Sequence, residues 1–100
     1  MGNQRKEQAL TIAKRNTTER NLQKAYEELI ELSLELIQRV NKPHKNNDGA
    51  IIKEIADVKI RLWYLEERYG KKNINHAIDN KLNILKHVNI RRRRDKQSVS

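Results

Sequence analysis

Two pairs of acidic residues have the type and spacing that metal-dependent chemistry needs. Glu28 and Glu31 form one pair and Glu54 and Asp57 form the other, and in each pair the two residues are three positions apart. On a helix this spacing places both carboxylates of a pair on one face. Two such helices packed antiparallel would bring four carboxylates together, and a cation would be needed to neutralise them. Hard oxygen ligands predict Mg²⁺, with Mn²⁺ as the second candidate.

The acidic pairs stand out against a basic chain. It contains 22 lysines and arginines against 13 aspartates and glutamates, which gives a net charge of +9. The segment 26–38 nevertheless holds four glutamates and no base. Like charges four positions apart, such as Glu27 and Glu31, cost a helix roughly 0.2–0.5 kcal/mol per pair. Cation binding is one reason to tolerate this repulsion. The alternative is that the acids form ordinary surface pairs, such as Asp57 with Arg61.

Apolar periodicity predicts the helices that would carry these acids. Apolar residues recur every three or four positions through residues 17–41, 49–69 and about 75–88. Pro43 ends the first of these helices, and Gly70 stands where a glycine commonly follows the last helical residue. Residues before Asn16, the expected cap of the first main helix, are only weakly periodic. No strand pattern appears. We therefore expect an all-α fold, a helical bundle of three main helices plus a short N-terminal helix.

The predicted helices also bear on assembly and domain organisation. Each of the first two main helices shows two apolar stripes, so we expect a homo-oligomer, a dimer or tetramer, to complete the bundle. The length fits one domain, which we assign to residues 1–90, followed by a basic and polar C-terminal tail at 91–100. The chain has no cysteine, no apolar run near about 18 residues and no apolar signal segment. We expect a cytoplasmic protein without a membrane partner.

The acidic pattern extends beyond the two pairs. Glu27, Glu28 and Glu31 read as Glu-Glu-x-x-Glu, and after 22 intervening residues Glu54 and Asp57 read as Glu-x-x-Asp within Glu-Ile-Ala-Asp-Val. With the helix lengths and the intervening loop, this pattern resembles the MazG-like all-α nucleoside triphosphate pyrophosphohydrolases, in particular their short phage- and Firmicute-type members. That superfamily includes dimeric dUTPases and dCTP pyrophosphatases. The resemblance covers roughly three quarters of the chain, from residue 16 to 88.

The resemblance implies a hydrolase that cleaves an NTP or dNTP to NMP and pyrophosphate and so controls the nucleotide pool. Mg²⁺ would be held by four acids, Glu28, Glu31, Glu54 and Asp57. Glu27 would lie behind them or orient the attacking water. Lys81 stands where the family often has a lysine facing the substrate, whereas Ile84 and Val88 occupy positions where an arginine is common. The base and sugar preference does not follow from these acids, because it depends on the shape of the pocket.

Two other hypotheses compete with this interpretation. The run Arg91–Arg94 is typical of a small basic helical protein that binds nucleic acid electrostatically, although no aromatic residues are interleaved with it. The second rival is an inactive interaction module that keeps the bundle without turnover. Trp63 and Tyr64 are candidates for stacking on a nucleobase, but aromatic residues at helical spacing more often belong to a core or a dimer interface. Dependence on Mg²⁺ and on the acids separates the enzyme from both rivals.

Overall fold

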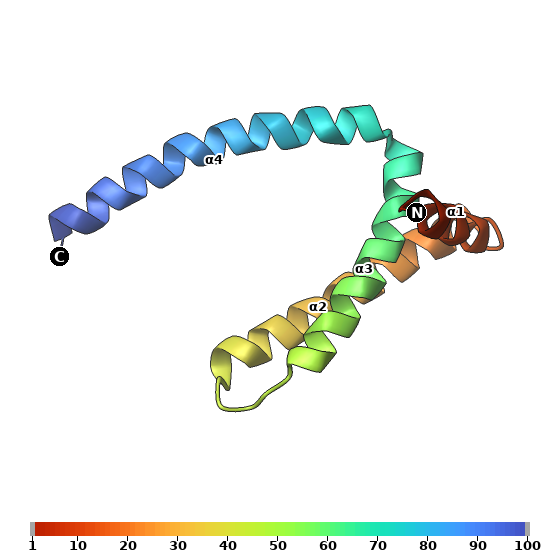
Figure 1. The fold of residues 1–100 in the computed structure, drawn as a ribbon, viewed down its shortest axis with the longest axis horizontal. Helices are drawn as coiled ribbons and strands as arrows, with labels where there is room; N and C mark the ends of the chain where they lie inside the picture. Colours follow the sequence, from red (N-terminus) through yellow and green to blue (C-terminus); the bar gives the residue numbers. More distant parts are fainter. Residues whose placement is uncertain (1, 100) are drawn as a thin grey trace. The chain divides into compact units, whose positions relative to one another are not determined.

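The computed structural model describes the backbone of residues 2–99 and the surroundings of the side chains of residues 3–88. Its elements are four helices, α1 (Gly2–Ala13), α2 (Thr18–Asn41), α3 (Asp48–Tyr69) and α4 (Lys71–Val99) (Figure 1). No strand occurs within 2–99, which confirms the all-α prediction. Within the described residues, none of the helices combines the length and apolar character that crossing a bilayer requires.

The chain divides into two compact units. Met1–Arg68 contains α1, α2 and α3, and Tyr69–Ser100 contains α4. The four acids of the predicted metal site all belong to the first unit. Arg91–Arg94 and Lys81 belong to the second. The predicted boundary between a domain at 1–90 and a tail at 91–100 stays a prediction.

A side-chain cap starts α2 and a buried amide joins it to α1. Thr17 Oγ1 accepts a hydrogen bond from the Arg20 backbone N–H at 3.1 Å, so Thr17 is the N-cap. The expected cap, Asn16, lies instead in the turn after α1, where its backbone N–H donates to the Ala13 carbonyl. The buried Asn21 side chain donates from Nδ2 to the same carbonyl at 2.8 Å. The Ala13 carbonyl at the end of α1 therefore accepts two hydrogen bonds, one from the turn and one from α2.

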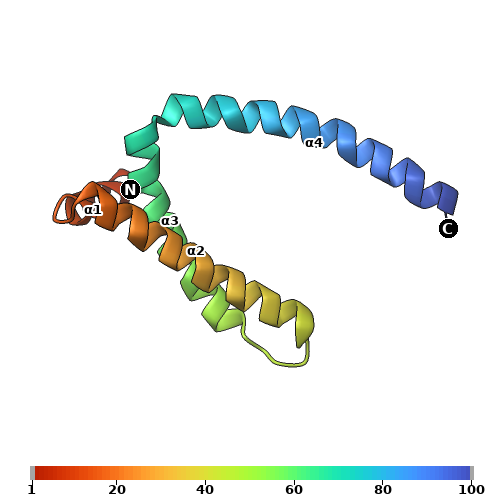
Figure 2. The same ribbon diagram turned by 180° about the vertical axis from the view of Figure 1, so that it is seen from behind.

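Helices α2 and α3 run antiparallel and lie side by side (Figures 1 and 2). The loop between them is fixed by Asn47, whose Nδ2 donates to the backbone carbonyl and to Oε2 of Glu35, both at 2.9 Å. Glu28 lies seven residues before Glu35, and Glu54 lies seven residues after Asn47. Seven residues are close to two helical turns, so the contact between Asn47 and Glu35 sets a register that places Glu54 opposite Glu28.

Gly70 separates α3 from α4. Its φ of +95° lies in the region that favours glycine, and a Cβ placed there would lie 2.8 Å from Asn73 Nδ2. The predicted glycine after the second main helix is therefore confirmed. The last helix differs from the prediction at both ends, because α4 begins at Lys71 and continues through the arginine run to Val99. No glycine or proline interrupts this stretch, and arginine is a good helix former.

The buried apolar core of the first unit is small. Among the described residues the buried hydrophobic side chains are Ala9, Ala13, Ala25 and Val58. Four large side chains along one side of α2 remain 52–58 % exposed, and we call them the α2 apolar stripe: Tyr26, Ile30, Leu34 and Ile37. Such a row of exposed apolar groups is unusual for a small soluble unit.

Candidate metal centre

The antiparallel pair α2 and α3 brings three of the predicted acids together. Glu28 projects from α2, and Glu54 and Asp57 project from successive turns of α3. One carboxylate oxygen from each residue lies within 4.8 Å of the oxygens of the other two. All three side chains are half-buried. This geometry follows from the spacing of the α3 acids on one helical face and from the register set by Asn47.

The other two predicted acids lie outside this triad. Glu31 is exposed on α2, one turn after Glu28, and it still affects Glu28 through its charge and a side-chain hydrogen bond. Glu27 forms an ion pair with Arg20, in which Oε1 lies 3.8 Å from the guanidinium Nη1. The carboxylate of Glu27 is therefore engaged along α2 rather than with the triad. The roles expected for these two residues stay predictions.

The environment of Glu28 disfavours the negative charge of its carboxylate. Burial raises the pKa of Glu28 above its ordinary value of 4.5, and the nearby charges of Asp57, Glu31 and Glu54 raise it further. Two oxygens, Glu28 Oε2 and Glu54 Oε2, are buried and accept no hydrogen bond from the described residues. Buried acceptors in native proteins almost always have a partner.

The triad therefore fits the ion that the sequence predicts. Three carboxylates supply hard oxygen ligands, and their oxygens are close enough to share one cation. A divalent ion between them would provide the partner that the two buried oxygens lack and would offset the mutual repulsion of the charges. Mg²⁺ typically binds through a few carboxylates and keeps its remaining positions for water and substrate phosphates. The donor set is thus suitable, and the identity of the ion remains a prediction.

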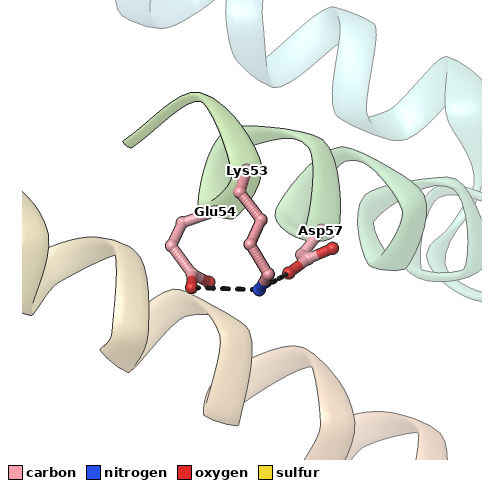
Figure 3. A network of polar contacts seen from close by, with 3 residues as sticks. All are labelled: Lys53, Glu54 and Asp57. Carbon is pink, nitrogen blue, oxygen red and sulfur yellow. Dashed lines mark hydrogen bonds and ion pairs between the residues drawn. The ribbon is translucent and has the colours of Figure 1, made fainter. Parts of the chain in front are cut away.

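A lysine that the sequence did not single out also reaches the cluster. Lys53 Nζ lies 3.0 Å from Asp57 Oδ2 and 3.4 Å from Glu54 Oε1 (Figure 3). These ion pairs raise the pKa of Lys53 above its usual value, with the hydrogen bond to Asp57 as the main cause. Asp57 therefore pairs with the base one turn before it, and no ion pair with Arg61 occurs among the described residues. The alternative of an Asp57–Arg61 surface pair is not what the structure shows.

The remaining candidate residues lie elsewhere. Lys81 is exposed on α4, in the second unit, and its proposed contact with substrate stays a prediction. Trp63 faces α1, where it lines a groove of about 420 Å³ together with apolar residues of both helices and two bases. Tyr64 borders a different hollow near the α1–α2 turn. Trp63 thus lies on a different side of α3 from Asp57, because six residues along a helix correspond to a rotation that leaves them about 120° apart.

Comparison with known proteins adds no further assignment. No protein family model matches the chain, and neither curated proteins nor solved structures gave a match. The resemblance to the MazG-like enzymes accordingly rests on the acidic pattern and helix lengths of the sequence, and the structure contributes the geometry of the triad.

Proposed function

We propose that this protein is a Mg²⁺-dependent nucleoside triphosphate pyrophosphohydrolase of MazG-like type. The observation that supports the proposal most is the triad of Glu28, Glu54 and Asp57, drawn from two antiparallel helices with two buried oxygens lacking partners. An acidic triad on its own occurs in other classes of protein. Here it coincides with the Glu-Glu-x-x-Glu and Glu-x-x-Asp pattern, which is what favours this reaction over other uses of a divalent ion.

The proposed reaction adds water across the α–β phosphoanhydride. The water oxygen forms a bond to one of the two phosphorus atoms while the bridging P–O bond breaks. Attack on the α phosphorus releases pyrophosphate, and attack on the β phosphorus releases NMP. In either case the water proton passes to a base. When bound, the ion would neutralise phosphate charge and lower the pKa of a water molecule. Glu28, Glu54 and Asp57 would hold it, and Glu31 would complete the set from its exposed position one turn along α2.

Glu27 is the residue proposed to orient the water. Its ion pair with Arg20 is partly exposed, and such pairs are typically worth about 0.2–1 kcal/mol. Glu27 can therefore leave Arg20 at little cost when substrate binds. Arg20 would then keep its hydrogen bond to Gln23 Oε1, which lies 2.7 Å from Nη1, and its unpaired charge would suit a phosphate oxygen of a polyanionic substrate.

A homo-oligomer, a dimer or tetramer, is part of the proposal. The α2 apolar stripe is exposed in the single chain, although its residues are of the kind that a bundle buries. A second copy of the chain would cover it and would close the α2–α3 pair into a larger bundle.

A panel of NTPs and dNTPs with Mg²⁺ tests the enzyme, with products resolved as NMP plus pyrophosphate or NDP plus phosphate. Glu54→Gln and Asp57→Asn should each lower turnover by more than about a hundredfold. Glu67→Gln, an exposed acid on the same helix, is the matched control and should retain activity. Full turnover in excess EDTA, or in both site variants, would contradict the metal assignment.

The charge of the second unit supports one further candidate function, nucleic-acid binding. Residues 69–100 contain nine lysines and arginines against two aspartates, so this unit carries +7 of the net charge of +9. In the structure these bases belong to a single long helix. A basic helix of this kind attracts polyanions in a salt-dependent way. Tight binding to DNA or RNA without turnover of any nucleotide would favour this candidate over the enzyme.

A further inference from the structure

Lys53 occupies the carboxylates that the proposed metal would use. Its Nζ lies 3.0 Å from Asp57 Oδ2 and 3.4 Å from Glu54 Oε1 (Figure 3). These two acids are held on α3 with exposed fractions of 32 % and 12 %, whereas the Lys53 side chain is 68 % exposed. The lysine therefore approaches a fixed and half-buried pair of carboxylates from the solvent side.

A single ammonium neutralises this site incompletely. Glu28 Oε2 and Glu54 Oε2 remain buried without a hydrogen-bond donor even though Lys53 is in place. An ammonium carries one charge, and its contacts here reach only the acids of α3. The site thus keeps an excess of negative charge that a divalent ion would satisfy better.

The position of Lys53 also allows it to leave. Its charge is carried on a flexible four-carbon stem, and most of that stem is in solvent, so the ammonium can swing outward by side-chain rotation without moving α3. A cation placed between the three acids would repel the ammonium and would take over its oxygens. Binding of the ion and release of Lys53 are therefore coupled events.

We propose that Lys53 is an internal counter-ion that competes with the divalent ion. It stabilises the acidic cluster when the ion is absent, and it must be displaced before the ion binds, so it sets the ion concentration at which the site fills. This inference depends on the metal centre of the proposed function. It goes beyond that function because it assigns a regulating role to a residue outside the acidic pattern.

Isothermal titration of the full-length, EDTA-stripped protein with MgCl₂ and MnCl₂ tests the competition. Removing Lys53 in Lys53→Met should raise the affinity for either ion about threefold to tenfold, because two exposed ion pairs no longer have to break. Lys53→Arg keeps the charge and should stay near the wild type. Lys59→Met removes an exposed lysine that faces the α1–α3 groove, and it should change the affinity less than Lys53→Met does.

Thermal unfolding gives a second readout that does not depend on catalysis. Without metal, Lys53→Met should melt below the wild type, because the cluster has lost its counter-ion. With saturating Mn²⁺ the two proteins should melt at similar temperatures, since Lys53 is displaced in the wild type and absent from the variant. Circular dichroism confirms that the variant remains helical, and Lys53→Gln repeats the measurement with a polar side chain.

Three outcomes would overturn the inference. If the wild type binds the ion and Lys53→Met binds it with equal or lower affinity, Lys53 is not a competitor although the metal centre stands. If the metal-free variant melts at or above the wild type, Lys53 does not stabilise the cluster. If neither protein binds Mg²⁺ or Mn²⁺, the metal centre itself fails, and the proposed function fails with it.

Discussion

Among single residues, Glu28 links the charge of the acidic cluster to the stability of the fold. Its pKa is raised above 4.5 by burial and by the charges of Asp57, Glu31 and Glu54. In the unfolded chain the same carboxyl titrates near 4.5, so between 4.5 and the raised pKa the folded state binds more protons than the unfolded state. The contribution of Glu28 to stability is therefore favourable at low pH and decreases as pH rises through this window.

Glu28→Gln should remove this dependence in the metal-free protein. The wild type in EDTA should lose stability, relative to the variant, as pH rises from about 4.5 upward through the raised pKa of Glu28, because only the wild type ionises a half-buried carboxyl there. Urea unfolding at a series of pH values measures the difference. Glu67→Gln, at an exposed acid of α3, controls for removing a carboxyl elsewhere in the same unit. Parallel curves for the wild type and Glu28→Gln would contradict the prediction.

The exposure of Glu31 predicts a graded effect of the acids on metal affinity. Glu31→Gln should weaken Mn²⁺ binding less than Glu54→Gln, because Glu31 is exposed and lies outside the triad, whereas Glu54 contributes a buried oxygen. Titration calorimetry ranks the two variants. An equal or larger loss in Glu31→Gln would mean that Glu31 binds the ion as directly as the triad does.

The sequence could predict the contacts of some site residues and not of others, depending on whether those contacts follow from spacing along a helix. The acids of α3 share a face because of their spacing alone, so the sequence could place Glu54 beside Asp57. Lys53 gave no comparable signal, since it is one of many lysines and its base-first order relative to Asp57 is the less favourable one on a helix. It nevertheless pairs with Asp57 because Glu54 adds a second carboxylate to the same ammonium. Such a three-way contact depends on side-chain conformation, which spacing does not specify.

Among the elements, α3 offers two glycines at which alanine should have opposite effects on stability. Gly49 lies within the helix and Gly70 directly follows it. Gly70→Ala should destabilise the protein by about 1–2 kcal/mol, because φ is +95° and the added Cβ would lie 2.8 Å from the Asn73 amide. Gly49→Ala, inside α3 with nothing within 4 Å of the new Cβ, should stabilise it by about 0.5–1 kcal/mol. Denaturant unfolding measures both. A stabilised Gly70→Ala would refute the backbone argument.

Helix ends show where sequence reasoning about elements succeeds and fails. The end of α2 before Pro43 and the end of α3 before Gly70 follow from backbone restrictions that each residue imposes by itself. The end of α4 carries no such marker, and the fading apolar periodicity after Val88 predicts an end that the structure does not have. The backbone continues to Val99 because helix formation needs no apolar stripe where the residues have adequate propensity.

The extended α4 gives a prediction for polyanion binding. Truncation after Ile90 removes residues with a net charge of +4, including Arg91–Arg94. Any binding of DNA or RNA should weaken, and its dependence on the logarithm of salt concentration should become shallower by up to about four. Pyrophosphohydrolysis should be largely retained, because the triad lies in the first unit. Salt titrations test the weakened polyanion binding, and a turnover assay tests the retained pyrophosphohydrolysis. Loss of turnover in a folded truncation would assign the arginines to the substrate site.

For the whole molecule, the sequence predicts assembly but does not predict its geometry. Two apolar stripes on one helix predict two faces that pack against other elements or other subunits. The number of these faces follows from periodicity alone. Which stripe faces α3 depends on the register that Asn47 and Glu35 establish, a contact between residues twelve positions apart. The α2 apolar stripe of Tyr26, Ile30, Leu34 and Ile37 is exposed, and part of the other stripe is exposed too, most of all Val40.

The last prediction concerns this exposed stripe. Light scattering coupled to size-exclusion chromatography should show a dimer or tetramer of the 11.9 kDa chain at micromolar concentration. Leu34→Glu should shift the mass toward the monomer, because it replaces about 2 kcal/mol of apolar burial by a charge. In a symmetric interface the change occurs in both subunits, which corresponds to a weakening of about a thousandfold or more. Gln4→Glu adds the same charge at an exposed position of α1, outside the stripe, and should leave the mass unchanged. A wild-type protein that is monomeric throughout, or a Leu34→Glu variant that assembles like the wild type, would show that another surface, or none, mediates assembly.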